Sequence, residues 1–418
     1  MKLIVKFYNF LKSFNYSKTK ISQPSVLMGY QGEELLEYFD IVEDNYICSV
    51  NKRPISLKII VEATKLFFLT AIKNPFLFLK TFKWAHTIYF ICGYLKIKKI
   101  TSLISFTDYN PLPIHIKKIL NNKLIILGIQ NSRRENRNNY FNFDYYFLLT
   151  PLKKKELFQN RNCKKYALGS LRLLLSINKN NCWKDVKKIP GVIKTHNSLI
   201  LISSLTDDFL KFINLNFGLN FTIKDFKKNL ERLITKYNQP NNYREMRFIN
   251  YLILCNYILD YALDKKEKIS IINRWNPDSQ NFQIEKKFFA NFQNFDLNHL
   301  NKIDKYNYIL SKKNTIYISD ISTLSRECLS INSKCIFFNY FIKYVEDYWV
   351  KNNSIFYSFK EKKKNFHLRL DKIKQLNKID FINEKKKIKS VSSIIVPEKK
   401  KLDNFLAMSN LKLKTFIK

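Results

Sequence analysis

An α/β fold in two domains is predicted by three features of the sequence, which has 418 residues. Short apolar runs that end at turn residues alternate with segments of helical periodicity. The runs are apolar throughout rather than at every second position, which is typical of parallel strands covered by helices on both faces. The alternation stops once, over residues 176–197, and then resumes. We therefore predict two Rossmann-like domains joined by a linker.

The first predicted domain covers residues 1–178. Its clearest strands are expected at 100–106, 124–130, 144–150 and 164–170, with a short helix over 113–120. Upstream, residues 66–99 are the most apolar part of the chain, but Lys73, Lys80 and Lys83 interrupt them. No uncharged run reaches the roughly 18 residues expected of a spanning helix. We interpret this region as two core helices, and the alternative is a basic, aromatic-rich face on a membrane surface.

The second predicted domain covers residues 198–346. Its strands are expected at 198–205, 268–274, 315–318 and 334–338, and its helices at 222–237, 243–266, 281–292 and near 305–310. Residues 347–418 are rich in lysine and weakly helical in pattern. We predict that they form a basic helical tail, with solvated lysines and a flexible end.

The net charge of +39 favours an anionic partner, such as nucleic acid, a membrane surface or a phosphorylated substrate. The excess is nearly all Lys, whereas bidentate phosphate recognition favours Arg. Lys, Asn, Ile, Phe and Tyr are abundant together and Gly and Pro are scarce, a set that AT-rich codons also favour. Codon usage therefore accounts for much of the charge. No helix-turn-helix or zinc spacing indicates a specific nucleic-acid partner.

The seven cysteines are scattered, and none has C-x-x-C spacing. This pattern predicts neither a disulfide framework nor a zinc site, and it favours a reducing compartment. The first twenty residues mix charges with apolar residues and lack a small-residue cleavage site, unlike a signal peptide. We expect a cytoplasmic protein, with peripheral binding to the inner face of the cell membrane as an added possibility.

Ligands of open α/β sheets bind beyond the carboxyl ends of the strands. Five places in the sequence meet that rule: Asp108 with Asn110, Gln130 with its basic loop, Gly169 with Ser170, Arg274, and residues 319–327. The last is the most informative. In TIYISDISTLSRECLSINSKCIFFN, residues 315–339, an apolar run meets Ser322, Thr323 and a helical segment that contains Glu327.

A helix N-terminus after this strand would offer free N–H groups and positive potential to a phosphate. Ser322 and Thr323 could add hydroxyl donors, and Glu327 could accept hydrogen bonds from the two hydroxyls of a ribose. The alternative is a well-capped helix, because Ser, Thr and Asp are common caps. The residues alone leave both interpretations open.

The pattern D-x-S-T-L-x-x-E-x-L followed by K-x-I-F-F resembles the C-terminal motif of bacterial surface-carbohydrate biosynthesis proteins. These are GT-B glycosyltransferase-like proteins, distantly similar to CDP-glycerol glycerophosphotransferases. Other pieces agree in order: T-D-Y-N-P at 107–111, I-Q at 129–130, D-Y-Y-F at 144–147, G-S-L-R at 169–172 and Y-W-V-K-N at 348–352. The resemblance spans roughly residues 95–385 and implies two Rossmann-like domains that face each other across a cleft.

The resemblance also implies a nucleotide-donor site in the second domain. Ser322 and Thr323 would meet the diphosphate and Glu327 the ribose. We include the neighbouring Asp320 and Arg326 in this donor set, together with Gly169 and Ser170 of the first domain. Related sequences have small residues where Ser325 and Arg326 stand here, so Arg326 either grips the diphosphate or closes the site.

Two catalytic roles are predicted. Arg274 follows a strand and could neutralise the departing nucleotide diphosphate; the alternative is a surface Arg paired with Asp278 or Glu285. Asp108 is the candidate general base for the acceptor hydroxyl, against a turn or N-cap role. His115 is the rival base.

The acceptor side is predicted at Gln130, Arg133 and Arg134. No metal or other cofactor is expected, because no D-x-D motif stands at a strand end. The predicted function is transfer of a sugar or polyol phosphate from a nucleotide-sugar or CDP-alcohol donor to a glycan or lipid-linked acceptor. The alternatives are a basic protein that binds nucleic acid or membrane without catalysis, and a degenerate GT-B paralogue.

Overall fold

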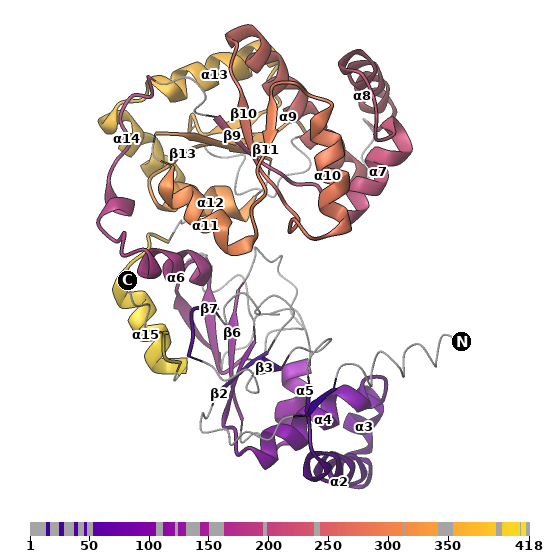
Figure 1. Ribbon diagram of the computed structural model, residues 1–418. Helices are drawn as coiled ribbons and strands as arrows, with labels where there is room; N and C mark the ends of the chain where they lie inside the picture. Colours follow the sequence, from indigo (N-terminus) through magenta and orange to yellow (C-terminus); the bar gives the residue numbers. More distant parts are fainter. Residues whose placement is uncertain are drawn as a thin grey trace. The chain divides into compact units, whose positions relative to one another are not determined.

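The computed structural model describes most of the chain. The described residues are 14–16, 25–28, 37–40, 46–47, 53–105, 112–121, 124–130, 143–149, 163–194, 199–237, 243–312, 314–320, 322–341, 354–389, 395–409 and 411–414. The chain divides into two compact units (Figure 1). Unit 1 comprises Met1–Leu175 and Glu398–Lys418, and unit 2 comprises Ser176–Pro397.

Unit 1 contains a six-stranded parallel sheet in the order β3-β2-β5-β6-β7-β8. Its strands are β2 (Ser25–Met28), β3 (Tyr46–Ile47), β5 (Ser102–Ser105), β6 (Ile125–Ile129), β7 (Tyr145–Leu148) and β8 (Lys164–Ala167). Two more strands, β1 (Phe14–Tyr16) and β4 (Arg53–Ile55), pair with each other. The order reverses between β2 and β5, as in doubly wound sheets. All four strands predicted in this unit are present.

The apolar region upstream of β5 forms a group of three helices, α2 (Leu57–Lys73), α3 (Pro75–Phe82) and α4 (Ala85–Ile97), as Figure 1 shows. Ser56 caps α2 by accepting from the N–H of Ile59, and Asn74 caps α3 by accepting from that of Leu77. Helix α4 is almost wholly buried in the core of unit 1. Among the described residues, no helix is long and apolar enough to cross a membrane.

Helices α2 and α4 pack closely at Gly93. A Cβ atom on Gly93 would lie 2.8 Å from the carbonyl oxygen of Ile59 and 2.9 Å from the backbone nitrogen of Ala63. Both neighbours are backbone atoms of α2, so neither can move aside without shifting that helix. Glycine therefore sets the distance between the two helices.

Replacing Gly93 by Ala should destabilise unit 1. The added methyl group forces the helices apart, at a cost of about 1–3 kcal/mol in the free energy of unfolding, although Ala favours an isolated helix. Urea denaturation of wild type and variant measures the difference. Gly191→Ala is the matched control, because no atom lies within 4 Å of a Cβ there. Equal stability of Gly93→Ala and wild type would contradict this packing.

The remaining helices among the described residues of unit 1 are α5 (Leu112–Ile119), α6 (Leu171–Lys179), whose last residues fall in unit 2, and α15 (Lys399–Ser409). Phe405 of α15 packs edge-on against Phe147 of β7, with ring centroids 5.0 Å apart. Further along, Phe39 and Leu413 form an antiparallel bridge. The described residues near the C-terminus therefore contribute buried side chains, such as Leu402 and Phe405, to unit 1.

Unit 2 is built on a second six-stranded parallel sheet, in the order β11-β10-β9-β12-β13-β14. The strands are β9 (Leu199–Ile202), β10 (Ile269–Ile272), β11 (Phe295–Leu297), β12 (Ile316–Ser319), β13 (Lys334–Asn339) and β14 (Tyr357–Phe359). Numbered from β9, this is the order 3-2-1-4-5-6 of Rossmann folds. Successive strands are added towards one edge of the sheet from β9 to β11 and towards the other edge from β12 to β14, so the strand order reverses between β9 and β12.

Helices lie on both sides of this sheet in Figure 1. They are α7 (Asp207–Phe217), α8 (Ile223–Tyr237), α9 (Tyr243–Lys265), α10 (Gln280–Ala290), α11 (Lys302–Ser311), α12 (Thr323–Ser330), α13 (Lys363–Gln375) and α14 (Lys378–Lys389). Helix α9 is buried nearly all round, so it is a core helix of the unit. The strands and helices predicted for the second domain are found here within a few residues.

The predicted linker belongs to unit 2, and the predicted tail is divided between the two units. In the linker, Val186 and Ile193 are buried, and the N–H of Ile193 donates to the carbonyl of Lys374. From the tail, β14 joins the sheet of unit 2, and α13 buries Phe366 and Leu370. Several tail cations pair with acids instead of facing solvent alone, among them Lys363 with Asp260, Arg369 with Glu361 and Lys374 with Glu267.

Candidate functional site

The carboxyl ends of the neighbouring strands β9 and β12 lie at the point where the strand order of the unit 2 sheet reverses. Ser203 and Ser204 follow β9, and Asp320 follows β12. All three are buried, and the Ser204 hydroxyl donates to Oδ1 of Asp320. Oδ2 of Asp320 is also buried, and it has no hydrogen-bond partner among the described residues. This is the place where open α/β sheets bind ligands.

Helix α12 begins at the same edge of the sheet. Ser322 is its N-cap, and its Oγ accepts from the N–H of Leu324 at 3.2 Å. One turn on, the buried Ser325 hydroxyl donates to Oγ of Ser319 at 2.5 Å, which fastens the helix to β12. Thr323 is therefore held in the first turn, where the N–H groups have no partners within the helix and the potential is positive.

Glu327 lies one turn into α12. Its side chain is buried, with 7% of the residue exposed, and Oε2 accepts a hydrogen bond of 3.1 Å from the hydroxyl of Tyr306. Tyr306 belongs to α11, the helix before β12. The contact fixes the orientation of the carboxylate. Arg326, its neighbour, is partly exposed on the same helix.

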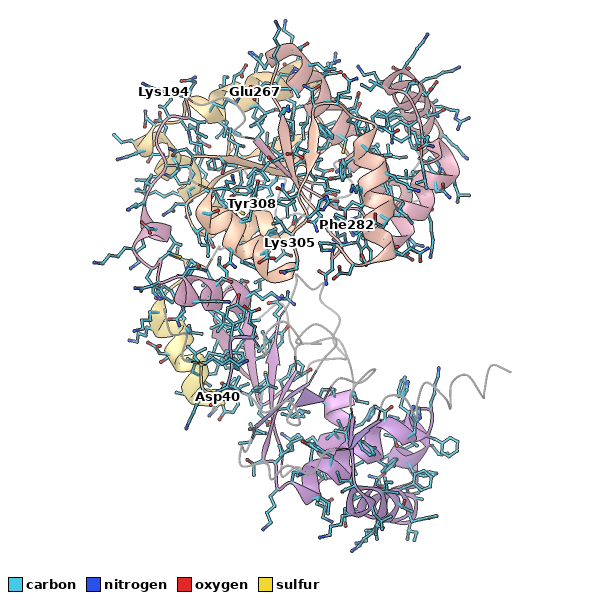
Figure 2. The ribbon with its side chains drawn as sticks, in the orientation of Figure 1. Asp40, Lys194, Glu267, Phe282, Lys305 and Tyr308 are labelled. Carbon is cyan, nitrogen blue, oxygen red and sulfur yellow. The ribbon has the colours of Figure 1, made fainter. Side chains whose placement is uncertain are left out.

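Arg274 follows β10, and other groups hold its backbone. The N–H of Arg274 donates to both carboxylate oxygens of Glu285, at 2.9 and 3.2 Å, and that of Trp275 donates to Oε2 at 3.2 Å. The carbonyl of Arg274 accepts from Nζ of Lys305 at 2.9 Å. Figure 2 labels Lys305 on α11. Glu285 therefore binds the backbone of Arg274, rather than forming the surface ion pair that we weighed for it.

The Arg274 side chain interacts electrostatically with charged residues of this group. Arg274 as a whole residue is exposed, yet partial desolvation of its guanidinium and the neighbouring Arg247 lower its pKa, while Asp320 and Glu285 raise it. Burial raises the pKa of the Glu285 carboxyl, against the hydrogen bonds that it accepts. Two arginines and two buried acids, from four different elements, thus interact at one edge of the sheet. Two of them, Arg274 and Asp320, are predicted site residues that the sequence separates by 46 positions (320 − 274).

The other predicted positions belong to unit 1. Gln130 is buried after β6, and its Oε1 accepts from the N–H of Leu149 at 2.9 Å. Gly169 follows β8 with φ of 85°, a conformation that favours glycine. Ser170 accepts from the N–H of Leu173 in the first turn of α6. These hydrogen bonds give Gln130 and Ser170 structural roles, and their predicted substrate roles stay predictions.

Three predicted residues, Asp108, Arg133 and Arg134, lie outside the described residues. Strand β5 ends at Ser105, just before Asp108 in the sequence. The rival base, His115, lies in α5, where its Nδ1 is buried without a partner among the described residues. Burial, Lys118 and Lys80 lower its pKa.

Sequence reasoning missed several members of this site: Ser203, Ser204, Arg247, Lys305 and Tyr306. A signal existed for the two serines, because they end a predicted apolar strand and the rule on strand ends applies to them. Lys305 and Tyr306 stand in a predicted helix, and nothing local shows which way they face. In the described part of the chain, no cluster of His, Cys, Asp and Glu could hold a metal ion.

Two Rossmann-like units with parallel sheets make this an α/β protein of GT-B-like fold. No family model matches the sequence, and no curated protein matches it.

Solved structures show likenesses at low identity. The alignment with the wall teichoic acid polymerase TagF, soaked with CDPG, covers 98% of this chain and 94% of the TagF chain, with a TM-score of 0.42 and 8% sequence identity. UDP-N-acetylglucosamine 2-epimerase from Rickettsia bellii covers 92% and 96%, with a TM-score of 0.42 and 14% identity. The Methanocaldococcus jannaschii UDP-GlcNAc 2-epimerase, in complex with UDP-GlcNAc and UDP, covers 88% and 98%, with a TM-score of 0.40 and 10% identity. These likenesses concern the fold alone.

Proposed function

We propose that unit 2 binds a nucleotide-activated donor, and that the protein transfers a sugar or polyol phosphate from it to a glycan or lipid-linked acceptor. One observation carries the proposal. The N-terminus of α12, Asp320 after β12 and Arg274 after β10 all follow carboxyl ends of strands of one parallel sheet, around the point where its strand order reverses. The motif resemblance of residues 320–338 supports the same assignment.

In this proposal the diphosphate lies against the first turn of α12. The N–H groups there and the Thr323 hydroxyl donate to its oxygens. Arg274 and Arg247 supply positive charge, which the leaving nucleotide needs most as its bond to the transferred group breaks. The buried carboxylates of Asp320 and Glu285 oppose the two arginines, so the cluster is not left as bare positive charge before the donor binds.

Glu327 would bind the ribose. A carboxylate can accept hydrogen bonds from two neighbouring hydroxyls, and Tyr306 holds this one in a fixed orientation. Arg326 is partly exposed, and in this proposal it contacts the phosphates instead of closing the site. Asp108 remains the proposed general base and Gln130, Arg133 and Arg134 the proposed acceptor side. That no metal is needed also stays a prediction.

A thermal-shift screen tests the proposal. CDP-glycerol, UDP-N-acetylglucosamine, GDP-mannose and a CMP-linked sugar would each be added to the full-length protein. A true donor at a hundredfold excess over Kd should raise the melting temperature by about 5–10 °C. Binding without turnover would indicate the degenerate paralogue. If no donor shifts the transition and DNA binds with a steep salt dependence, the basic binding protein is the better account.

A further inference from the structure

Helices α2 and α3 of unit 1 expose large apolar side chains. Seven of them are each 59–78% exposed: Leu57, Val61, Phe68 and Ile72 on α2, and Phe76, Leu79 and Phe82 on α3. The two helices are in contact, and large exposed apolar side chains gathered on neighbouring helices indicate an interaction site. We call these seven residues the α2–α3 face.

The exposed residues of α2 form a stripe. Leu57, Val61, Phe68 and Ile72 are spaced by four, seven and four residues, which places them on one side of a helix. The opposite side is the one that folding uses, because Ile59 and Leu66 are buried there and the helix meets α4 at Gly93. Helix α2 is thus apolar on two sides, and the core of unit 1 accounts for only one.

The charge around the α2–α3 face is positive. Residues 57–84 contain five lysines, Lys58, Lys65, Lys73, Lys80 and Lys83, and a single acid, Glu62. Glu62 is paired with Lys96 of α4 at 2.5 Å. Nζ of Lys80 lies 4.1 Å from the centre of the Phe76 ring, so cationic and apolar groups are directly adjacent. A partner must therefore accept apolar side chains and carry negative charge beside them.

We propose that the α2–α3 face docks onto the surface of a bilayer that contains anionic lipid. The apolar side chains enter the boundary between headgroups and acyl chains, and the lysines stay among the phosphates. The helices lie in the plane of the membrane. This inference concerns unit 1 and does not depend on the donor site proposed for unit 2.

Vesicle sedimentation of the full-length protein tests the inference. The protein should pellet with vesicles of phosphatidylcholine and phosphatidylglycerol, and much less with phosphatidylcholine alone. The double variant Phe68→Ser, Ile72→Ser should bind at least about tenfold more weakly. The variant Lys80→Gln, Lys83→Gln should bind these vesicles about tenfold more weakly. A higher salt concentration should likewise weaken vesicle binding by the wild type.

Matched controls come from unit 2. Leu215 and Ile379 are 84% and 70% exposed, so Leu215→Ser, Ile379→Ser removes comparable exposed apolar side chains elsewhere. Lys224→Gln, Lys228→Gln removes two exposed lysines of α8. Both controls should bind vesicles like wild type. Vesicle binding unchanged by the Phe68 and Ile72 substitutions would overturn the proposal. The proposal would also be overturned if wild type does not bind vesicles and instead forms a dimer that these substitutions dissociate, because a second copy would then cover the α2–α3 face.

Discussion

Replacing Arg274 by Ala is expected to weaken binding of a nucleoside diphosphate by about 10- to 150-fold, the range for losing charge-assisted hydrogen bonds to a phosphate. The backbone of Arg274 holds its place through Glu285 and Lys305, so the substitution removes the cation without removing these contacts. Arg274→Lys keeps the charge but loses the planar guanidinium, so its nucleotide affinity should lie between those of wild type and Arg274→Ala. Fluorescence titration with CDP and UDP measures the affinities.

The control for this prediction is Arg232→Ala, on the exposed surface of α8. It removes the same charge from unit 2 away from the proposed site, so it should leave the affinity unchanged. Equal losses in Arg274→Ala and Arg232→Ala would mean that general positive charge binds the nucleotide. The role assigned to Arg274 would then be wrong.

Replacing Glu285 by Ala should give the largest loss of stability among substitutions at this site. Glu285 is fully buried and accepts from the N–H groups of Arg274 and Trp275. Its removal leaves both donors without this partner and opens a cavity, at a cost of about 3–5 kcal/mol. For a unit of this size the melting temperature should fall by roughly 6–20 °C.

Glu285→Gln and Glu231→Ala complete this experiment. Glutamine keeps one carbonyl acceptor in the same place, so it should recover part of the lost stability. Glu231 is exposed on α8, and its replacement should change the melting temperature little. A Glu285→Ala variant that melts like wild type would show that the carboxylate does not support the loop after β10.

The sequence predicted the β12–α12–β13 step well, because each part has a strong local cause. Ile316–Ser319 and the start of β13 are short runs apolar on both faces, and Ser322 is a typical N-cap. The same alternation predicted that unit 2 is Rossmann-like, although it did not predict the order of the strands in the sheet. Strand ends could therefore be found, and with them Arg274 and Asp320.

Other features depend on tertiary packing and left little local signal. Strands β11 and β14 have three residues each, too few for a periodic pattern, and they stand at the two ends of the sheet order. Tyr306 reaches Glu327 because α11 lies beside α12, across 21 residues of sequence. The lysine runs of the predicted tail suggested solvent, yet acids distant in sequence, such as Asp260 and Glu267, pair with them.

The central claim is that the N-terminus of α12 and Glu327 bind a nucleotide. Calorimetric titration of CDP and of UDP into wild type and Glu327→Ala tests it most directly, with Glu231→Ala as the control and circular dichroism to show that each variant is folded. We predict that wild type and Glu231→Ala bind one nucleotide per chain, and that Glu327→Ala binds it at least about tenfold more weakly. Wild-type affinity in Glu327→Ala, or no binding of either nucleotide to any of the proteins, would contradict the claim.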